Sequence, residues 1–194
     1  MREAELRRTT KETDILVKWN LDQSGKCDVD TGIGFFDHML ELLAVHSGTL
    51  LTVGAKGDLN VDSHHTVEDV GIVLGKVFKE ALGDKAGIKR YGSFLLPMDE
   101  SLVSVCMDVS GRPYFVFNCD IPKTQIGNFE TEMCEEFFRA FAFNAEINLH
   151  INLLYGKNCH HMIEGIFKAF AHSLKEAVTV DSNISGVLSS KGVL

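Results

Sequence analysis

A five-residue pattern that occurs twice is the feature that most constrains this sequence. His64-His65-Thr66-Val67-Glu68 recurs 96 residues later as His160-His161-Met162-Ile163-Glu164. Similar segments follow both copies and include Lys-Glu-Ala at residues 79–81 and 175–177. Because self-similarity at a fixed offset is typical of duplicated folding units, we expect a chain built from two similar halves.

The same order of elements is predicted for each half: strand, strand, helix, strand, helix. The two motif-bearing segments have apolar residues at helical spacing, such as Val67, Val70, Val73 and Val77 in the first. The other expected elements are strands around Ile15–Leu21, Leu50–Val53, Leu102–Met107, Tyr114–Phe117 and Ile147–Leu154, and helices over Phe35–Val45 and Glu135–Phe143.

This order of elements predicts the α+β class, with mostly antiparallel sheets that each have helices on one face. We expect residues 1–94 to form the first half and residues 95–180 the second, packed as one unit overall. Residues 181–194 are polar and rich in Gly and Ser, which is typical of a frayed tail.

Composition and charge exclude several classes of partner. The net charge of -8 argues against nucleic acid, which is bound by basic surfaces. Charged residues interrupt every apolar stretch, so no membrane span is expected, and Met1-Arg2-Glu3 begins no secretory signal. The five cysteines are scattered without a Cys-x-x-Cys pair, which favours free thiols. A cytoplasmic location is expected.

The repeated motif has the spacing of a metal-binding helix. His64 and Glu68 are four residues apart, so they lie on one helix face and can share an ion. His65 is rotated by about 100° and reaches a different ion more naturally. Two metal sites are therefore predicted, with ligands from both halves or from neighbouring subunits. Imidazole and carboxylate ligands suit manganese, iron, cobalt or zinc. The order differs from the His-Glu-x-x-His motif of metalloproteases.

Further candidates extend the predicted site. His38 precedes His64 by 26 residues and Glu136 precedes His160 by 24, so either side chain is a candidate to complete a coordination sphere. Cations that would bind a phosphate or carboxylate near the metals are Arg90, Arg112, Lys168 and Lys191. Taken singly, each of these residues also fits a structural polar group or a solvated surface charge.

Sequence blocks from residue 8 to residue 192 resemble the imidazoleglycerol-phosphate dehydratase family. The blocks are Arg8-Thr9-Thr10-Lys11-Glu12-Thr13, Phe36-Asp37-His38-Met39-Leu40, Asp62 to Asp69, Pro97-Met98-Asp99-Glu100, Ser110-Gly111-Arg112-Pro113-Tyr114, Gly156 to His161, and Ser189-Ser190-Lys191-Gly192. Several blocks in the family's order make the resemblance specific.

The resemblance implies a hydro-lyase of L-histidine biosynthesis that converts D-erythro-imidazoleglycerol phosphate to imidazole acetol phosphate and water. It also implies two ferredoxin-like (ribosomal-S5-domain-2-like) halves and a homo-oligomer of 24 subunits with active sites at subunit interfaces. Two Mn²⁺ ions per active site would stabilise the substrate as an imidazolate, which expels the adjacent hydroxyl.

Residue roles also follow from the resemblance. The implied metal ligands are His38, His64, His65, Glu68, Glu136, His160, His161 and Glu164. Many relatives have a histidine where Glu136 stands, so either this carboxylate or water fills that position. Substrate binding is implied for Glu12, His38, His46, Arg90, Arg112, Lys168, Ser189, Ser190 and Lys191, which gives the tail a function. Catalytic roles are implied for Glu12, His46 and Glu164.

Our hypothesis for the proton transfers concerns Glu12 and His46. Glu12 would take the carbon-bound proton, because a carboxylate at a strand end can enter a neighbouring site. His46 would protonate the departing hydroxyl or only position it.

Two other functions remain open at this point. A metal-dependent hydrolase would use the same His and Glu clusters to hold a metal-bound hydroxide, but it explains neither the adjacent histidines in both copies nor the cations of the tail. A non-catalytic metal-binding or shell-forming protein is the second alternative. Turnover on an imidazole phosphate separates both from the dehydratase.

Overall fold

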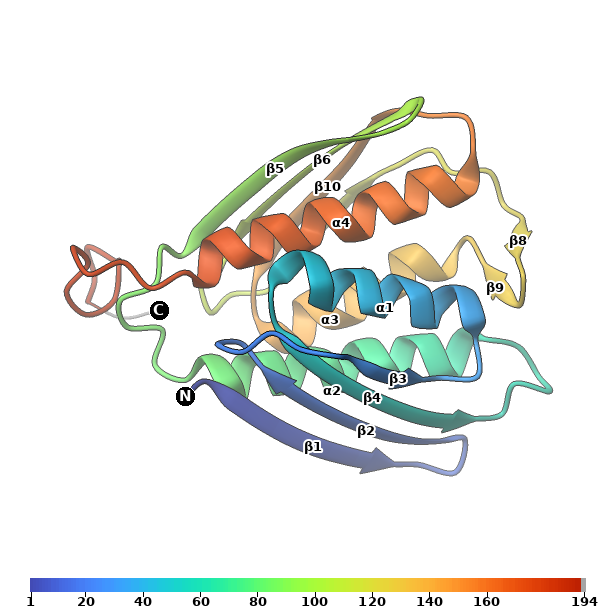
Figure 1. Ribbon diagram of the computed structural model, residues 1–194, viewed down its shortest axis with the longest axis horizontal. Helices are drawn as coiled ribbons and strands as arrows, with labels where there is room; N and C mark the ends of the chain where they lie inside the picture. Colours follow the sequence, from blue (N-terminus) through green and yellow to red (C-terminus); the bar gives the residue numbers. More distant parts are fainter. Residues whose placement is uncertain (193–194) are drawn as a thin grey trace.

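In residues 1–192, the part of the chain that our computed structural model describes, four helices lie between two four-stranded sheets (Figure 1). The first sheet has the strand order β1 (Glu3–Thr9), β2 (Thr13–Asn20), β4 (Leu50–Gly57) and β3 (Asp28–Asp30). The second has the order β5 (Tyr91–Met98), β6 (Ser101–Asp108), β10 (Asn148–Tyr155) and β7 (Tyr114–Asn118). The helices are α1 (Gly34–Ser47), α2 (His64–Leu82), α3 (Met133–Ala145) and α4 (Cys159–Val178).

The matching topology of these sheets confirms the α+β class and agrees with the predicted duplication. In each sheet the strands pair antiparallel except at one edge, where β3 is parallel to β4 and β7 is parallel to β10. A short hairpin of β8 (Gln125–Ile126) and β9 (Phe129–Glu130) is added in the second half. The expected boundary between residues 94 and 95 falls inside β5.

The strands form because alternate residues face the helix layer. In β2, Ile15, Val17 and Trp19 are fully buried, and this alternation places their side chains on one face of the sheet. The indole nitrogen of Trp19 donates a hydrogen bond of 2.8 Å to the hydroxyl of Thr49, so this buried polar atom is satisfied. The first sheet is thereby fixed against the helices.

Helices from different halves pack against each other. The helix α2 contacts α3 at close range through Gly71 and Gly75, where no larger side chain would fit. A Cβ atom on Gly71 would lie 2.8 Å from the Phe137 carbonyl oxygen, and one on Gly75 would lie 2.6 Å from that of Phe141. The helix α1 of the first half lies beside α4 of the second (Figure 1). The helix layer is therefore shared between the halves.

The helices α1 to α4 all begin at the same end of the molecule, on the right in Figure 1. We call it the histidine end, since it holds His64, His65, His160 and His161. The opposite end, the tail end, holds the N-terminus and residues 181–192.

None of the helices formed by residues 1–192 combines the length and the apolar character needed to span a membrane.

Candidate metal centre

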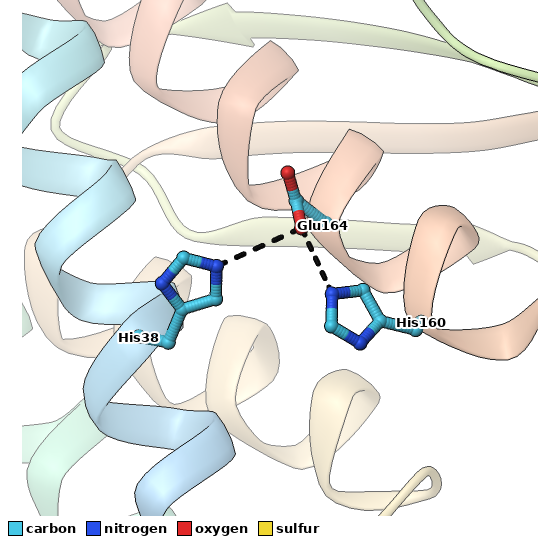
Figure 2. Close-up of side chains that lie close together, drawn as sticks. All are labelled: His38, His160 and Glu164. Atoms are coloured by element: carbon cyan, nitrogen blue, oxygen red, sulfur yellow. Dashed lines mark hydrogen bonds and ion pairs between the residues drawn. The ribbon is translucent and has the colours of Figure 1, made fainter.

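Three predicted ligands meet at the histidine end (Figure 2). One ligand atom from each of His38, His160 and Glu164 lies within 4.8 Å of the other two. The Oε2 atom of Glu164 is 3.0 Å from Nε2 of His160 and 3.7 Å from Nε2 of His38. Two imidazole nitrogens and a carboxylate oxygen at this spacing are a donor set that divalent transition metals bind. The first half supplies His38, and the second half supplies the other two.

Local structure explains why these side chains converge. Asn158 precedes α4, and its side-chain oxygen accepts a hydrogen bond of 2.9 Å from the backbone N–H of His160, which caps the helix. His160 and Glu164 are four residues apart and therefore share one helix face. The ring of Phe35 packs edge-on against His160 with 5.0 Å between ring centroids. The contact of α1 with α4 then brings His38 to the same place.

Glu164 is the most buried of the three ligands, with 6% of its surface exposed. Burial raises the pKa of its carboxyl, but Lys168 and His160 lower that pKa by a larger amount, so the net pKa lies below its usual value. The Nζ atom of Lys168 is 2.5 Å from Oε1 of Glu164, while the other oxygen faces the histidines. The carboxylate therefore stays ionised and available to a metal at neutral pH.

The first copy of the motif is more open. Nε2 of His64 lies 3.9 Å from Oε2 of Glu68, and both side chains are more than two-fifths exposed. Nδ1 of His65 lies 3.0 Å from Asp58 and 3.9 Å from Glu12, which extends from the turn between β1 and β2. The hydrogen bond with Asp58 raises the pKa of His65 above its usual value.

In the second copy of the motif, a carboxylate also holds His161. Nδ1 of His161 lies 2.8 Å from Oε2 of Glu100. The other oxygen of Glu100 accepts hydrogen bonds from the backbone N–H groups of Lys157 and Asn158, just before α4. The bond with His161 is the main cause of a low pKa at Glu100 and of a raised pKa at His161. A carboxylate on Nδ1 leaves Nε2 of an imidazole free for a metal.

Sequence reasoning did not identify Asp58 or Glu100 as partners of the motif. Glu100 stands in the Pro97-Met98-Asp99-Glu100 block of the resemblance, which is the one signal that pointed to it. Asp58 lies in the loop before the first motif, and no pattern singled it out.

Glu136 lies apart from the His38 cluster. It is in the first turn of α3, and its Oε2 atom is 3.6 Å from Nε of Arg139. Within residues 1–192, the metal-binding group contains His38, His160 and Glu164 without Glu136. Ligation by Glu136 stays a prediction.

Apart from Lys168, which pairs with Glu164 at the metal cluster, the predicted phosphate-binding residues lie at the tail end. The Arg90 guanidinium pairs with Asp108 at 2.6 Å and donates a hydrogen bond of 2.8 Å to the Leu188 carbonyl oxygen. Ser189 and Ser190 line an open pocket together with Arg90. Arg112 is exposed on the loop between β6 and β7, which begins beside Arg90 because the backbone N–H of Val109 donates to the Arg90 carbonyl oxygen. Lys191 is exposed in the tail.

The length of α4 separates these residues from the metal cluster. The backbone N–H of Arg90 bonds to the carbonyl of Ala177 in the last turn of α4, whereas His160 is in its first turn. Seventeen residues at about 1.5 Å per residue place these turns about 25 Å apart. One small substrate cannot reach both ends of one chain. Of the predicted substrate-binding residues, His38 and Lys168 lie at the metal cluster. His46 contacts His172 two turns further along α1.

Comparison with known proteins gave consistent similarities. Residues 31–174 match the family model described as imidazoleglycerol-phosphate dehydratase. The chain is 57% identical to the imidazoleglycerol-phosphate dehydratases of Clostridium kluyveri and Streptococcus sanguinis, over 100% of each chain. The crystal structure of the imidazoleglycerol-phosphate dehydratase from Staphylococcus aureus superimposes with a TM-score of 0.84 at 42% identity, covering 92% of this chain and 99% of that one. A Pyrococcus furiosus IGPD structure also gives 0.84, at 35% identity, covering 97% of this chain and 100% of that one.

Proposed function

The chain belongs to the imidazoleglycerol-phosphate dehydratase family, and on that premise we propose that it converts D-erythro-imidazoleglycerol phosphate to imidazole acetol phosphate and water. The observation that carries this proposal is the meeting of His38, His160 and Glu164 in one cluster, beside a second His-His-x-x-Glu motif at the same end. The reaction requires an imidazole to be activated, and metal-binding imidazoles and carboxylates are suited to that task.

We assign one divalent ion, Mn²⁺ in our proposal, to His38, His160 and Glu164. His64, His65, Glu68 and His161 are the remaining ligands, and because His65 and His161 are rotated from their motif neighbours, they would bind a different ion from those neighbours. Glu136 or water would complete the set. When bound, the ions would supply Lewis-acid chemistry that makes the substrate imidazole N–H more acidic, and a ring that has lost this proton has the electrons to expel the adjacent hydroxyl. Asp58 and Glu100 hold Nδ1 of His65 and His161, which directs the other nitrogen of each ring to a metal.

Glu12 is our candidate for the base that removes the carbon-bound proton. It lies in the turn between β1 and β2, is about half exposed, and reaches within 3.9 Å of His65. A carboxylate there can approach a substrate bound by the first copy of the motif and accept a proton on one of its oxygens.

Phosphate recognition belongs to the tail end in our proposal. Arg90, Arg112, Ser189, Ser190 and Lys191 offer guanidinium, ammonium and hydroxyl donors, which suit a phosphate. Since these residues lie about 25 Å from the metal cluster of their own chain, the phosphate site of one copy would face the metals of another. A homo-oligomer with active sites between subunits follows, and sedimentation measures its size.

Dehydratase activity with and without added Mn²⁺ tests the proposed function. The expected result is formation of the acetol phosphate that stops after chelation and returns with Mn²⁺. If the protein binds Mn²⁺ but leaves the substrate unchanged, the proposed reaction is wrong. Release of inorganic phosphate without dehydration would favour a hydrolase.

A further inference from the structure

A small polar cluster interrupts the apolar contact between α2 and the first sheet. Arg8 of β1 and Thr13 of β2 occupy positions whose side chains face the helix layer, where the neighbouring strand positions hold apolar residues. Asp69 of α2 is buried, with 8% of its surface exposed. Because a buried polar group is costly unless it is hydrogen-bonded or its charge is paired, the partners of Asp69 show what the cluster does.

One carboxylate oxygen of Asp69 joins the helix to both strands. Its Oδ2 atom is 2.6 Å from Nη1 of Arg8 and accepts a hydrogen bond from the hydroxyl of Thr13. The guanidinium of Arg8 compensates the negative charge that the helix places in the core. Asp69 therefore ties α2 to the β1–β2 hairpin at the point where the two strands are about to turn.

Hydrogen bonds continue from Thr13 into the turn that carries Glu12. Oγ1 of Thr13 is 3.2 Å from Oγ1 of Thr10. Since the Thr13 hydroxyl gives its proton to Asp69, the Thr10 hydroxyl is the donor to Thr13. Oγ1 of Thr10 also accepts hydrogen bonds from the backbone N–H groups of Glu12, at 3.1 Å, and of Thr13, at 3.0 Å. Two hydroxyls thus connect the carboxylate of Asp69 to the backbone of Glu12.

The same face of α2 carries the histidine that Glu12 approaches. His65 and Asp69 are four residues apart, so they lie on one helix face, and α2 packs on β1 and β2. Oε2 of Glu12 is 3.9 Å from Nδ1 of His65. The β1–β2 turn and the start of α2 lie at the same end of the molecule (Figure 1). A shift of the turn relative to α2 would therefore move the Glu12 carboxylate relative to the first copy of the motif.

We propose that Asp69 is a positioning residue for Glu12. By holding the β1–β2 turn through Thr13 and Thr10, it fixes the backbone from which the Glu12 carboxylate reaches the carbon-bound proton of the substrate. The Glu12 side chain is itself about half exposed, so a fixed backbone limits the positions that its carboxylate can take. This inference rests on the proposed function and on Glu12 as the base.

Substitutions at two points of the connection test the proposal. Asp69→Asn keeps the size of the side chain but removes the charge that pairs with Arg8. Thr13→Val keeps the branched shape and removes the hydroxyl, whereas Thr13→Ser keeps the hydroxyl. The matched control is Asp14→Asn, because Asp14 pairs with Arg7 at 2.5 Å in the same hairpin, on the face of the strands turned away from α2.

In the complete Mn²⁺-loaded protein, Asp69→Asn and Thr13→Val should each lower kcat by about 10- to 100-fold, because a displacement of about 1 Å in a catalytic group can cost about 10²-fold in rate. KM, Mn²⁺ content and assembly should stay unchanged. Thr13→Ser should retain most of the parent kcat, and Asp14→Asn should match the parent. If Asp69→Asn does not fold, the comparison of Thr13→Val with Thr13→Ser decides the test.

A second readout separates positioning of Glu12 from any other role in the site. If Asp69 and Thr13 act only through Glu12, Asp69→Asn and Thr13→Val should cause no further loss of kcat in a protein that already carries Glu12→Gln. Residues that act independently of Glu12 would lower kcat by the same factor in both backgrounds.

Parent kcat in Asp69→Asn and Thr13→Val would overturn the positioning role while leaving Glu12 and the reaction in place. Equal losses in both backgrounds, a similar loss in Thr13→Ser or Asp14→Asn, or a loss of Mn²⁺ would show a different role and also overturn it. Near-normal turnover in Glu12→Gln would exclude the base and its positioning residue together. A parent protein that forms no acetol phosphate would instead overturn the proposed function.

Discussion

An active site shared between copies predicts complementation between two inactive variants. Glu12→Gln damages the histidine end without removing a predicted metal ligand. The double variant Arg112→Met with Lys191→Met damages the tail end, and neither side chain forms an ion pair within residues 1–192. Each protein alone should assemble and bind Mn²⁺ but have little activity.

The expected recovery follows from the distance along α4. Since the ends of one chain are about 25 Å apart, every site would combine the histidine end of one copy with the tail end of another. When equal amounts of the two chains assemble at random, half of the histidine ends and half of the tail ends are intact. About a quarter of the sites then contain both intact ends, so mixed oligomers should have about 25% of the parent activity.

The assay is dehydratase activity of oligomers purified from cells that produce both chains with different affinity tags. Controls are the same two proteins produced separately and mixed without exchange. If mixed oligomers are no more active than the average of the two variants, both ends serve a site within one chain, and the distance argument is wrong.

Three other predictions concern single residues. Glu12→Gln should lower kcat by about 10² to 10⁴ with Mn²⁺ content unchanged, measured by steady-state kinetics and metal analysis; near-normal turnover would exclude Glu12 as the base. Gly92→Ala should lower the free energy of unfolding by about 1–3 kcal/mol and with it the melting temperature, because the added Cβ would lie 1.9 Å from a backbone oxygen of α4. The control Gly34→Ala places its Cβ in open space and should leave the melting temperature unchanged or higher. A thiol reagent should label exposed Cys106 in the native protein and buried Cys134, whose pKa is raised by burial, only after unfolding; equal rates would contradict the fold.

The sequence predicted the buried elements better than the edges of the sheets. The long helices α2 and α4 have apolar residues at helical spacing. Of the central strands, β2 has apolar residues at alternate positions, and β10 is mostly apolar. The edge strands β1 and β5 were not predicted, because β1 is rich in charged residues such as Glu3, Glu5 and Arg7, and β5 contains Gly and Pro. Such residues are typical of edge strands, where fewer partners constrain the side chains.

At the site, the sequence predicted which residues are candidate metal ligands but not which side chains they contact. Spacing along one helix indicated that His160 and Glu164 share a face, and the structure places them 3.0 Å apart. The pairing of Glu100 with His161 joins residues 61 positions apart, and that of His46 with His172 joins residues 126 apart. Only the packing of elements sets such contacts. Local patterns likewise did not reveal that the predicted phosphate residues other than Lys168 lie at the opposite end of α4 from the metal ligands.

The shared helix layer limits how this chain can be divided. Because α2 contacts α3 through Gly71 and Gly75, and α1 lies on α4, each half covers apolar helix surface of the other. A chain cut between the halves would yield fragments that expose this surface until they meet, and neither fragment would carry the cluster of His38 with Glu164. Although the motif occurs twice, the molecule is not modular: each half needs the other to cover its apolar helix surface, so a substitution at the helix contact of one half alters the packing of the other.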